Sequence, residues 1–438
     1  MTLEELIVRI ESREAVVGVV GLGYVGLPFA MEKAKVGFRV LGFDRSAPRV
    51  AMANAGDSYI QDVPSTDLAA AIAAGHFEAT GDFARLADTD VVVVAVPTPL
   101  TVNLTPDLQY VEAVTRNIAT LLRPGQLVCL ESTTYPGTTD EVMRPILEES
   151  GLRADDDFFL AHSPERVDPG NTRYSTKNTN KVVGGVGPRS LEAATRFYGE
   201  TIDHVVPVSS AGAAEMVKVF ENTFRAVNIA LVNELTLLCD RMDLSVWEVL
   251  DAAFTKPFGI MPFYPGPGVG GHCIPLDPHY LEWKAREYNF TTRFIALAGE
   301  INRRMPEFVR DKAVRVLGRL GVASKGAKVL ALGVAYKRDL DDHRESPAVE
   351  VIELLEDEGM VVDHHDAFVP TYEHGGRTRV GVELTSEQLE MYDLVVILTD
   401  HSGVDYEQVV RHAPHVLDTR NATGRLALGA LAERVTLL

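Results

Sequence analysis

Short apolar runs alternate with longer amphipathic stretches through the first half of the chain. The apolar runs span 15–20, 40–43, 90–97 and 125–133. Strands this apolar, separated by segments of helical length, are typical of a parallel sheet covered by helices on both faces. Two further runs, 181–185 and 204–208, are candidates to extend that sheet.

The middle of the chain has a different pattern. Residues 211–242 contain no proline and a single glycine, Gly212, and their apolar positions recur at helical spacing. A helix of this length often forms a spine between domains or a dimer interface. The Gly- and Pro-rich segment 257–275 that follows cannot be regular structure, and long loops in compact proteins are commonly functional.

A second alternating region follows near Lys325. Its strand-like runs are 327–336, 360–366, 393–400 and 415–421, and a helical stretch spans 346–359. This pattern predicts a second, smaller α/β domain.

Composition narrows the classes of partner. The formal net charge is −20, which disfavours nucleic acid and anionic lipid as partners. The three cysteines are far apart without a C-x-x-C pair, so neither a disulfide framework nor a zinc ribbon is indicated. The first residues do not resemble a signal peptide, and no apolar run is long enough to span a bilayer. We therefore expect a cytoplasmic protein without a membrane partner.

Three glycines form a dinucleotide-binding pattern. Gly21, Gly23 and Gly26 give G-x-G-x-x-G between a predicted strand and a predicted helix, where backbone N–H groups can hold a pyrophosphate. Asp44 ends the next strand and can accept hydrogen bonds from a ribose, which favours NAD over NADP. The neighbouring Arg45 weakens this preference for NAD over NADP. The alternative is a tight glycine turn without a ligand.

Cys273 lies in the sequence Gly-Gly-His-Cys-Ile-Pro-Leu-Asp that ends at Asp277. Flanking glycines allow a ligand close to the backbone, and a thiolate is a nucleophile. If a helix begins after Pro275, Asp277 lies in its first turn. The alternative is a buried structural cysteine, which Cys129 and Cys239 fit better. A metal site would need further ligands at suitable spacing, and none is found, so no metal is expected.

Lys218 and Asn222 are four residues apart in the predicted long helix and share one face. Both can donate hydrogen bonds to a developing oxyanion. The alternative is a solvated lysine and an unrelated asparagine, although the neighbouring residues are apolar.

Several segments together resemble the UDP-glucose/GDP-mannose dehydrogenase superfamily. The matching segments are GLGYVGLP (21–28), VPTP (96–99), ESTTYPGTT (131–139), SPERVDPGN (163–171), EMVKVFENTFRAVNIALVNE (215–234), GPGVGGHCIPLDP (266–278) and GVAYKRDLDDHRESPA (333–348). The resemblance implies an α/β fold of two Rossmann-like domains with parallel sheets joined by a long central helix. It implies an NAD-binding domain at 1–208, a central helical and dimerisation region at 209–310, and a UDP-sugar-binding domain at 311–438. A homodimer or higher oligomer is also implied.

The resemblance assigns roles to residues that match the family's motifs. It implies Cys273 as the nucleophile, Lys218 and Asn222 as the oxyanion donors, Asp277 near the thiol, Glu165 as the acid that helps water to cleave a thioester, and Thr133 as an assisting hydroxyl. The implied cofactor-binding residues are Gly21, Gly23, Tyr24, Val25, Gly26, Asp44, Arg45, Pro97, Thr98 and Thr133. The implied substrate-binding residues are Glu165, Arg166, Lys218, Asn222, Tyr264, Gly270, Lys337, Arg344 and Lys256, the last reaching into a neighbouring subunit.

The reaction implied by the resemblance is a four-electron, NAD-linked oxidation of a UDP-sugar at C6 to a uronate, which would serve polysaccharide biosynthesis or, equally, a glycosylated small molecule. His272, Leu276 and Arg166 depart from the UDP-glucose branch and resemble the N-acetylhexosamine branch. This favours UDP-GlcNAc as substrate, with UDP-ManNAc or UDP-glucose as alternatives. Arg166 is a candidate to read the acetamido group or a phosphate, and the alternative is a salt bridge to a neighbouring acid.

Other classes of protein fit less well. A silent sensor of NAD or nucleotide sugar would be favoured by loss of Cys273 or Lys218, and both are present. A thiol redox sensor would need a resolving cysteine near Cys273. No function is assigned to His364 and His365, for which solvated or core positions are the default.

Overall fold

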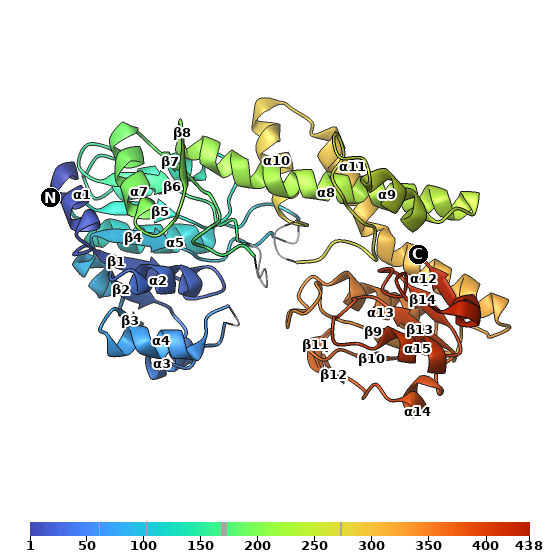
Figure 1. Cartoon of the computed structure of the whole chain (residues 1–438). Coiled ribbons are helices and arrows are strands. Elements are labelled where there is room, and N and C mark those ends of the chain that lie inside the picture. Colours follow the sequence, from blue (N-terminus) through green and yellow to red (C-terminus); the bar gives the residue numbers. More distant parts are fainter. Residues whose placement is uncertain (61, 102, 168–172, 272–273) are drawn as a thin grey trace. The chain divides into compact units, whose positions relative to one another are not determined.

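The structure is a computed structural model that describes residues 1–60, 62–101, 103–167, 173–271 and 274–438. By its internal contacts the chain divides into two compact units. The first comprises Met1–Glu221 with His279–Thr291, and the second comprises Asn222–Pro278 with Thr292–Leu438. Most elements of both units are labelled in Figure 1. These contacts do not test the three-part division at 208 and 310, which stays a prediction.

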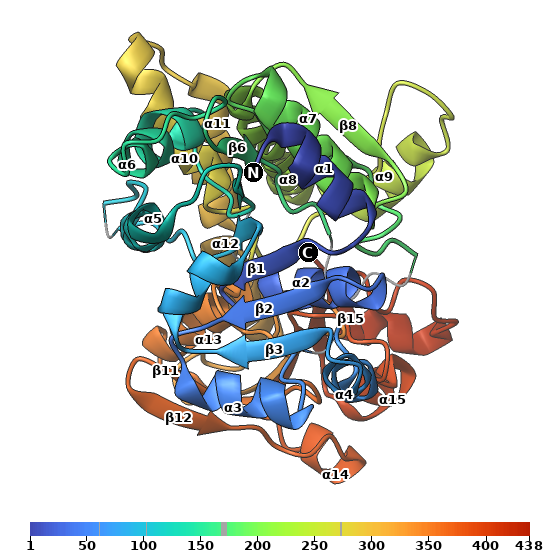
Figure 2. The same cartoon turned by 90° about the vertical axis from the view of Figure 1, so that its left-hand side faces the viewer.

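A mostly parallel sheet forms the centre of the first unit (Figure 2). Its strands are β1 (Val16–Val20), β2 (Arg39–Phe43), β3 (Phe77–Thr80), β4 (Val91–Val94), β5 (Leu127–Leu130), β6 (Phe159–His162), β7 (Lys181–Gly185) and β8 (Val205–Val208). The strand order is β3-β2-β1-β4-β5-β6-β7-β8, and of the described strand pairs in this sheet only β6–β7 is antiparallel. The first six strands have the doubly wound dinucleotide-binding order. The predicted parallel sheet and its extension by β7 and β8 are confirmed.

Both faces of this sheet are buried, as its apolar strands predict. Along β4, Val91 and Val93 join one hydrophobic cluster, while Val92 and Val94 join another on the opposite face. The first cluster includes residues of α1, α2, α4 and α7, and the second includes residues of α5 and α6. The helical elements of this unit are α1 (Leu3–Glu11), α2 (Gly26–Lys35), α3 (Ala47–Ala55), α4 (Ser65–Ala73), η1 (Phe83–Asp88), α5 (Gln109–Leu121), η2 (Thr139–Met143), α6 (Arg144–Glu148) and α7 (Pro188–Gly199).

The second unit contains a smaller parallel sheet of the order β10-β9-β13-β14-β15. Its strands are β9 (Lys328–Leu332), β10 (Val361–His365), β13 (Leu394–Ile397), β14 (Val416–Asp418) and β15 (Val435–Leu437). Val329 and Ala331 of β9 pack on one face, and Leu330 and Leu332 pack on the other. The helical elements of this unit are α9 (Val246–Phe254), α11 (Arg293–Arg303), α12 (Met305–Arg319), α13 (Pro347–Asp357), α14 (Ser386–Leu389), α15 (Tyr406–His412) and η4 (Gly429–Arg434). The second α/β domain predicted from the sequence is thus present.

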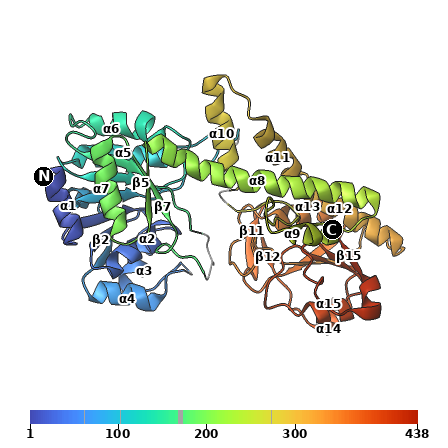
Figure 3. The same ribbon diagram turned by 45° about the horizontal axis from the view of Figure 1, so that its top comes forward.

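One continuous helix, α8 (Ala211–Met242), has the bounds that the sequence pattern predicts (Figure 3). Its first residues belong to the first unit and the rest, from Asn222, to the second. The helix α10 (Asp277–Ala285) and the short turn η3 (Arg286–Tyr288) follow the loop that carries Cys273. Among the described residues, no helix is long and apolar enough to cross a membrane.

The sequence pattern missed the antiparallel hairpin of β11 (Thr371–His374) and β12 (Arg377–Val380). Its strands are mostly exposed and polar, so they lack the apolar alternation that marks a strand. His364 is buried against the ring of Tyr372 from this hairpin, and the His365 ring is hydrogen-bonded to the Val382 carbonyl. Both histidines are therefore accounted for by packing.

Candidate active site

The glycine-rich turn after β1 is shaped for close backbone approach. Gly21 has φ +95°, and a Cβ there would lie 2.3 Å from the Ala95 carbonyl oxygen. A Cβ at Gly26, the first residue of α2, would lie 1.8 Å from the Gly21 carbonyl oxygen. A Cβ at Gly23 meets no described atom within 4 Å, so this position faces open space. Two glycines thus close the turn, and the third leaves room for a pyrophosphate at the start of a helix.

Asp44 directly follows β2 and is held beside that turn. Its Oδ2 accepts a hydrogen bond from the Leu22 N–H at 3.1 Å, and its Oδ1 accepts one from the Ser46 N–H at 2.8 Å. The side chain stays 11% exposed. Arg45 is exposed, and its guanidinium lies 5.4 Å from the centre of the Tyr110 ring. A fixed carboxylate at this place fits a ribose with a free 2′-hydroxyl.

The two loops at the carboxyl ends of β4 and β5 are tied together. The Thr98 hydroxyl donates to the Thr133 carbonyl at 2.6 Å, and the Val96 N–H donates to the Ser132 hydroxyl at 2.9 Å. Pro97 between them is exposed. The expected cofactor residues of both loops therefore lie at the same edge of the sheet as the glycine turn, where doubly wound folds bind ligands.

Glu215 of α8 connects the start of that helix to the segment after Thr133. Its carboxylate accepts the Gly137 N–H at 2.5 Å, the Thr139 N–H at 2.9 Å and the Thr139 hydroxyl at 2.7 Å. Burial outweighs these donors and raises the pKa of Glu215 to about 7. The contact fixes the part of α8 that carries Lys218 to the loop that carries Thr133.

Glu165 lies in a buried cluster of charges. Its Oε1 accepts the N–H groups of Arg166 and Val167, both at 2.8 Å, and its Oε2 lies 3.1 Å from the Lys181 ammonium. The same ammonium lies 3.3 Å from the Glu131 carboxylate. The side chains of Lys181 and Glu131 are 4% and 0% exposed, so water screens these charges little.

This environment moves the pKa values of the two acids apart. Burial raises the pKa of Glu131, and Lys181 offsets only part of that effect. Burial also opposes ionisation of Glu165, but the charge of Lys181 and the Val167 N–H outweigh it and lower its pKa, with Lys218 adding to the effect. Two carboxyl groups with opposite pKa shifts are a common feature of acid–base sites.

Lys218 and Arg166, both expected to bind substrate, have different surroundings in the structure. Lys218 is 8% exposed, so the solvated alternative does not describe it, and its charge acts on Glu165. The Arg166 guanidinium forms a bidentate ion pair with Glu221 at 2.5 and 3.2 Å and donates to the Asn180 carbonyl. The structure thus contains the salt bridge named as the alternative, and the contact of Arg166 with substrate stays a prediction.

In the second unit, Asn222 connects two charged groups. Its amide N–H donates to the Asp277 carboxylate, and its carbonyl oxygen accepts from Arg225. Asn222 and Asp277 are 0% and 2% exposed. Helix α10 begins at Asp277, which places this acid in the first turn as the sequence analysis expected. Cys273 and His272 lie outside the described residues.

The glycines that precede Cys273 pack against Tyr336 of the segment that follows β9. A Cβ at Gly270 would lie 2.7 Å from the Cβ of Tyr336, and one at Gly271, which has φ +87°, would lie 2.8 Å from its ring. Larger residues would displace the loop from Tyr336. The glycines therefore set the path of the chain that leads to Cys273.

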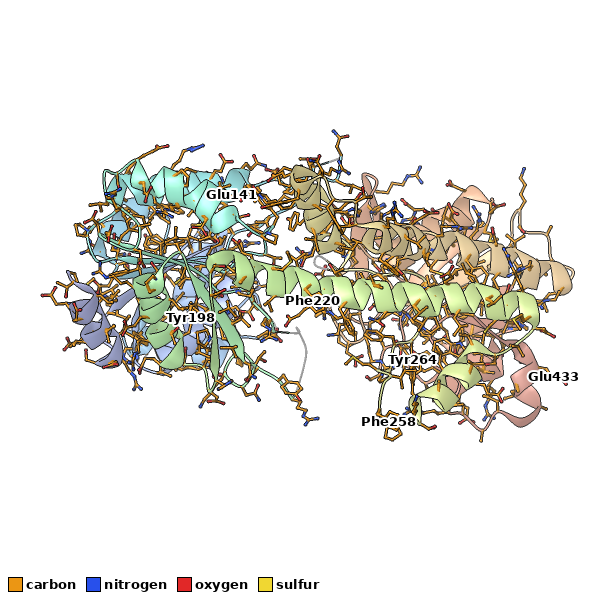
Figure 4. All side chains as sticks on the ribbon, turned by 90° about the horizontal axis from the view of Figure 1, so that it is seen from above. Glu141, Tyr198, Phe220, Phe258, Tyr264 and Glu433 are labelled. Carbon is orange, nitrogen blue, oxygen red and sulfur yellow. The ribbon has the colours of Figure 1, made fainter. Side chains whose placement is uncertain are left out.

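The remaining expected substrate residues lie in two other parts of the second unit. Arg344 is paired with Asp342 at 2.7 Å and stays half-exposed, and Lys337 is partly buried in the same loop. Tyr264 is stacked on Trp247, and its hydroxyl donates a hydrogen bond to Asp251. The exposed Lys256 lies over the ring of Phe258; Tyr264 and Phe258 are labelled in Figure 4. Contact of these residues with substrate stays a prediction.

Comparison with known proteins decides the family. The family models match consecutively: the NAD binding domain of the UDP-glucose/GDP-mannose dehydrogenase family at residues 15–202, its central domain at 212–304 and its UDP binding domain at 330–425. The chain belongs to the UDP-glucose/GDP-mannose dehydrogenase family. It is an NAD-dependent oxidoreductase, and the expected cofactor is confirmed.

Relatives within the family differ in the sugar named for them. The chain is 35% identical to a UDP-N-acetyl-D-glucosamine 6-dehydrogenase of Pseudomonas aeruginosa, covering 92% of this chain and 95% of the relative. It is 36% identical to an NDP-N-acetyl-D-galactosaminuronic acid dehydrogenase of Ralstonia nicotianae, covering 88% and 90%. A solved UDP-D-ManNAc dehydrogenase of Pyrococcus horikoshii is 33% identical, with a TM-score of 0.85 and coverage of 93% and 96%. The expected resemblance is confirmed, and the sugar is left open.

The family's UDP binding domain has its own acid in the place of Asp44. Gly333, with φ +87°, follows β9 as Gly21 follows β1, and Asp366 follows β10 as Asp44 follows β2. Asp366 accepts hydrogen bonds from the N–H groups of Val334 and Ala335, and its side chain is 0% exposed. Because this carboxylate is fully engaged by its own chain, the NAD-type ribose contact is available in the first unit and not at Asp366.

Sequence reasoning missed Glu131, Lys181 and Arg225. Glu131 and Lys181 adjoin the apolar strands β5 and β7, and a charged residue at a buried strand end was a usable signal. Arg225 follows Asn222 by three residues on α8, so its nearness to that side chain was also implied by helical spacing.

Proposed function

We propose that this dehydrogenase oxidises the C6 hydroxymethyl group of a UDP-N-acetylhexosamine to a carboxylate, in two NAD-dependent steps joined by a covalent intermediate on Cys273. UDP-GlcNAc is the first candidate, with UDP-ManNAc and UDP-glucose as alternatives. Support for the hexosamine class comes from His272, Leu276 and Arg166 and from relatives named for N-acetylated sugars. The relative from Ralstonia adds the galacto configuration to the candidates.

The observation that carries the proposal is the partly buried Glu165, whose pKa is lowered by the charges of Lys181 and Lys218. A two-electron alcohol dehydrogenase has no use for a second base, whereas cleavage of a thioester by water needs one. Bound NAD supplies the hydride acceptor in both oxidation steps. The turn at Gly23 and the carboxylate of Asp44 would hold its pyrophosphate and ribose.

Each remaining step of the reaction is assigned to particular residues of this chain. The Cys273 thiolate adds to the C6 aldehyde, and Lys218 and Asn222 donate hydrogen bonds to the oxyanion, where one good donor contributes roughly 3 kcal/mol. Asp277 holds the Asn222 amide in position. After the second oxidation, the oxygen of a water molecule attacks the thioester carbon while Glu165 takes a proton from that water. The C–S bond then breaks and returns the Cys273 thiolate.

We also propose that the enzyme is a homodimer or higher oligomer with α8 at an interface. Leu231, Leu238 and Met242 are 62%, 52% and 57% exposed and recur at spacings of seven and four on this helix. Apolar side chains at such spacing form one stripe, which a second copy of the same helix can cover. Lys256 would then reach the site of a neighbouring subunit. The net negative charge of the chain and the free thiols of Cys129 and Cys239 fit a cytoplasmic location.

The experiment that tests the proposal is to supply UDP-GlcNAc, UDP-ManNAc, UDP-GalNAc and UDP-glucose in parallel and to count NADH formed per sugar consumed. Two NADH per UDP-GlcNAc, with a carboxylate product by mass spectrometry and slower turnover of the others, is the expected result. Preference for another sugar would retain the mechanism and change the substrate. One NADH per sugar, with aldehyde as the product, would refute the covalent mechanism.

A further inference from the structure

Three charged groups come together at one edge of the first unit's sheet. Glu131 directly follows β5, Glu165 lies three residues after β6, and Lys181 opens β7. These strands are neighbours, and β7 runs antiparallel to β6, so all three residues lie at the same edge. The Lys181 ammonium is shared between the two carboxylates at 3.1 and 3.3 Å.

We propose that Lys181 is a positioning residue that holds the Glu165 carboxylate in place as the base for thioester cleavage, and that Glu131 moderates it by competing for the same ammonium. This inference rests on the proposed function. Glu165 and not Lys181 accepts the proton from water, so Lys181 acts through Glu165.

The geometry leaves Glu165 little freedom. One carboxylate oxygen accepts two backbone N–H groups, and the other faces Lys181. Removing the ammonium would free that second oxygen and leave two carboxyl groups close together in a buried site. The ammonium is the main charge that lowers the pKa of Glu165, so without it burial would dominate and Glu165 would hold its proton to higher pH. Replacing Glu131 by glutamine would have the opposite effect, because an amide competes less strongly than a carboxyl group for the Lys181 ammonium, which would then bind Glu165 more closely.

Other titratable groups surround the cluster, and none replaces Lys181. His162 of β6 is buried, and burial lowers its pKa to about 3, so it adds no positive charge near neutral pH. Glu215 is held by Gly137 and Thr139. The remaining groups that act on the cluster are Lys218 of α8, Cys129 of β5, Tyr198 of α7 and Lys33 of α2, while the Arg166 guanidinium is paired with Glu221. Lys33 donates to the Phe197 carbonyl at 2.6 Å, and Tyr198, which is labelled in Figure 4, is fully buried.

The test is the pH profile of thioester cleavage in single turnovers of the full-length enzyme. Free carboxylate is measured after acid quench, and the thioester on Cys273 is measured by intact-protein mass spectrometry. Lys181→Met is expected to accumulate the thioester and to move the midpoint of the profile upward by about one pH unit or more. Glu131→Gln is expected to move the midpoint downward, and Lys181→Arg to stay near wild type.

Lys177→Met serves as the matched control, because Lys177 is exposed in the segment before β7, and its profile is expected to be unchanged. Thermal unfolding and NAD binding check that each variant folds. If Lys181→Met does not fold, Glu131→Gln and Lys181→Arg still decide the matter.

Slower cleavage with unmoved midpoints in Lys181→Met and Glu131→Gln, or midpoints moving in the same direction, would overturn the proposal and leave the cluster a purely structural role. Failure of the proposed function is distinguishable, because the wild-type enzyme would then form no carboxylate from any UDP-sugar.

Discussion

The contrast between Asp366 and Asp44 leads to a quantitative prediction. Asp366→Asn is expected to destabilise the second unit strongly, whereas Asp44→Asn should change stability little and weaken NAD binding. The Asp366 carboxylate accepts five hydrogen bonds, from the N–H groups of Val334, Ala335, Phe368 and Val369 and from the His401 Nε2–H. The His401 tautomer follows from its Nδ1, which accepts the Asp339 N–H at 3.0 Å.

The magnitude follows from the number of donors that an asparagine cannot satisfy. Oδ2 of Asp366 accepts three of the donors and Oδ1 accepts two, so the single carbonyl oxygen of an asparagine can face only one of these sets, and its amide hydrogens then leave at least two donors of the other set unpaired. Two buried donors left unpaired cost roughly 1–3 kcal/mol each, which gives a loss of about 4 kcal/mol. At Asp44 the amide would lose one of two hydrogen bonds at a partly exposed site, for a cost of about 1 kcal/mol.

The pH dependence has a definite sign. The His401 and backbone donors outweigh burial and place the pKa of Asp366 well below its ordinary value of 3.8. The folded state therefore binds fewer protons than the unfolded state in acid, so this contribution to stability is present above pH 3.8 and is lost as the pH falls further. Asp366→Asn is expected to lack this acid-dependent part.

The assay is urea unfolding followed by hydrogen exchange, read separately on peptides of β9 and β10 and on peptides of β1 and β2. Asp366→Asn should lower protection in the first pair and leave the second pair near wild type. Wild-type protection in β9 and β10 of that variant would refute the reasoning, because it would mean that the backbone donors find other acceptors.

Three further predictions concern the site and the assembly. Gly23→Ala should fold normally, because its Cβ meets no described atom within 4 Å, and should weaken NAD binding measured by titration. Gly26→Ala should lower the melting temperature, because its Cβ would lie 1.8 Å from the Gly21 carbonyl oxygen. Equal melting temperatures of the two variants would contradict this prediction. Cys273→Ser should stop carboxylate formation while NAD still binds, and undiminished uronate production would refute the covalent role. Leu231→Glu with Leu238→Glu should shift the enzyme toward monomers in light scattering after size exclusion, and an unchanged mass would exclude this stripe from the interface.

Sequence reasoning anticipated the elements whose signal is local. The bounds of α8 follow from helical periodicity without an internal proline, and the glycine turn before α2 follows from the spacing of its glycines. Apolar runs located the strands because both faces of each sheet are buried. The hairpin of β11 and β12 escaped because its polar, exposed strands depend on cross-strand pairing that sequence alone does not display.

The candidate site was anticipated less evenly, for the same physical reason. Glu165 and Lys218 were found because they match sequence motifs. The groups that control the pKa of Glu165, Glu131 and Lys181, lie at the ends of other strands, so those motifs do not include them. Glu131 and Lys181 are 50 positions apart in the sequence. They come close in the folded sheet because their strands, β5 and β7, lie on either side of β6. Charge placement of this kind is a product of topology, so it becomes visible only when the strand order is known.

The two acids that follow the second strands show how one fold can serve two purposes. Asp44 and Asp366 occupy matching places after β2 and β10, beside glycines with positive φ. Position alone would predict a nucleotide ribose at both. The difference lies in what each carboxylate already accepts: two N–H groups at Asp44, and four N–H groups with a histidine at Asp366. A carboxylate with every acceptor position engaged and no exposed surface stabilises its own turn, whereas one that is partly exposed can still bind a hydroxyl, so the local donors and not the fold decide which unit takes the cofactor.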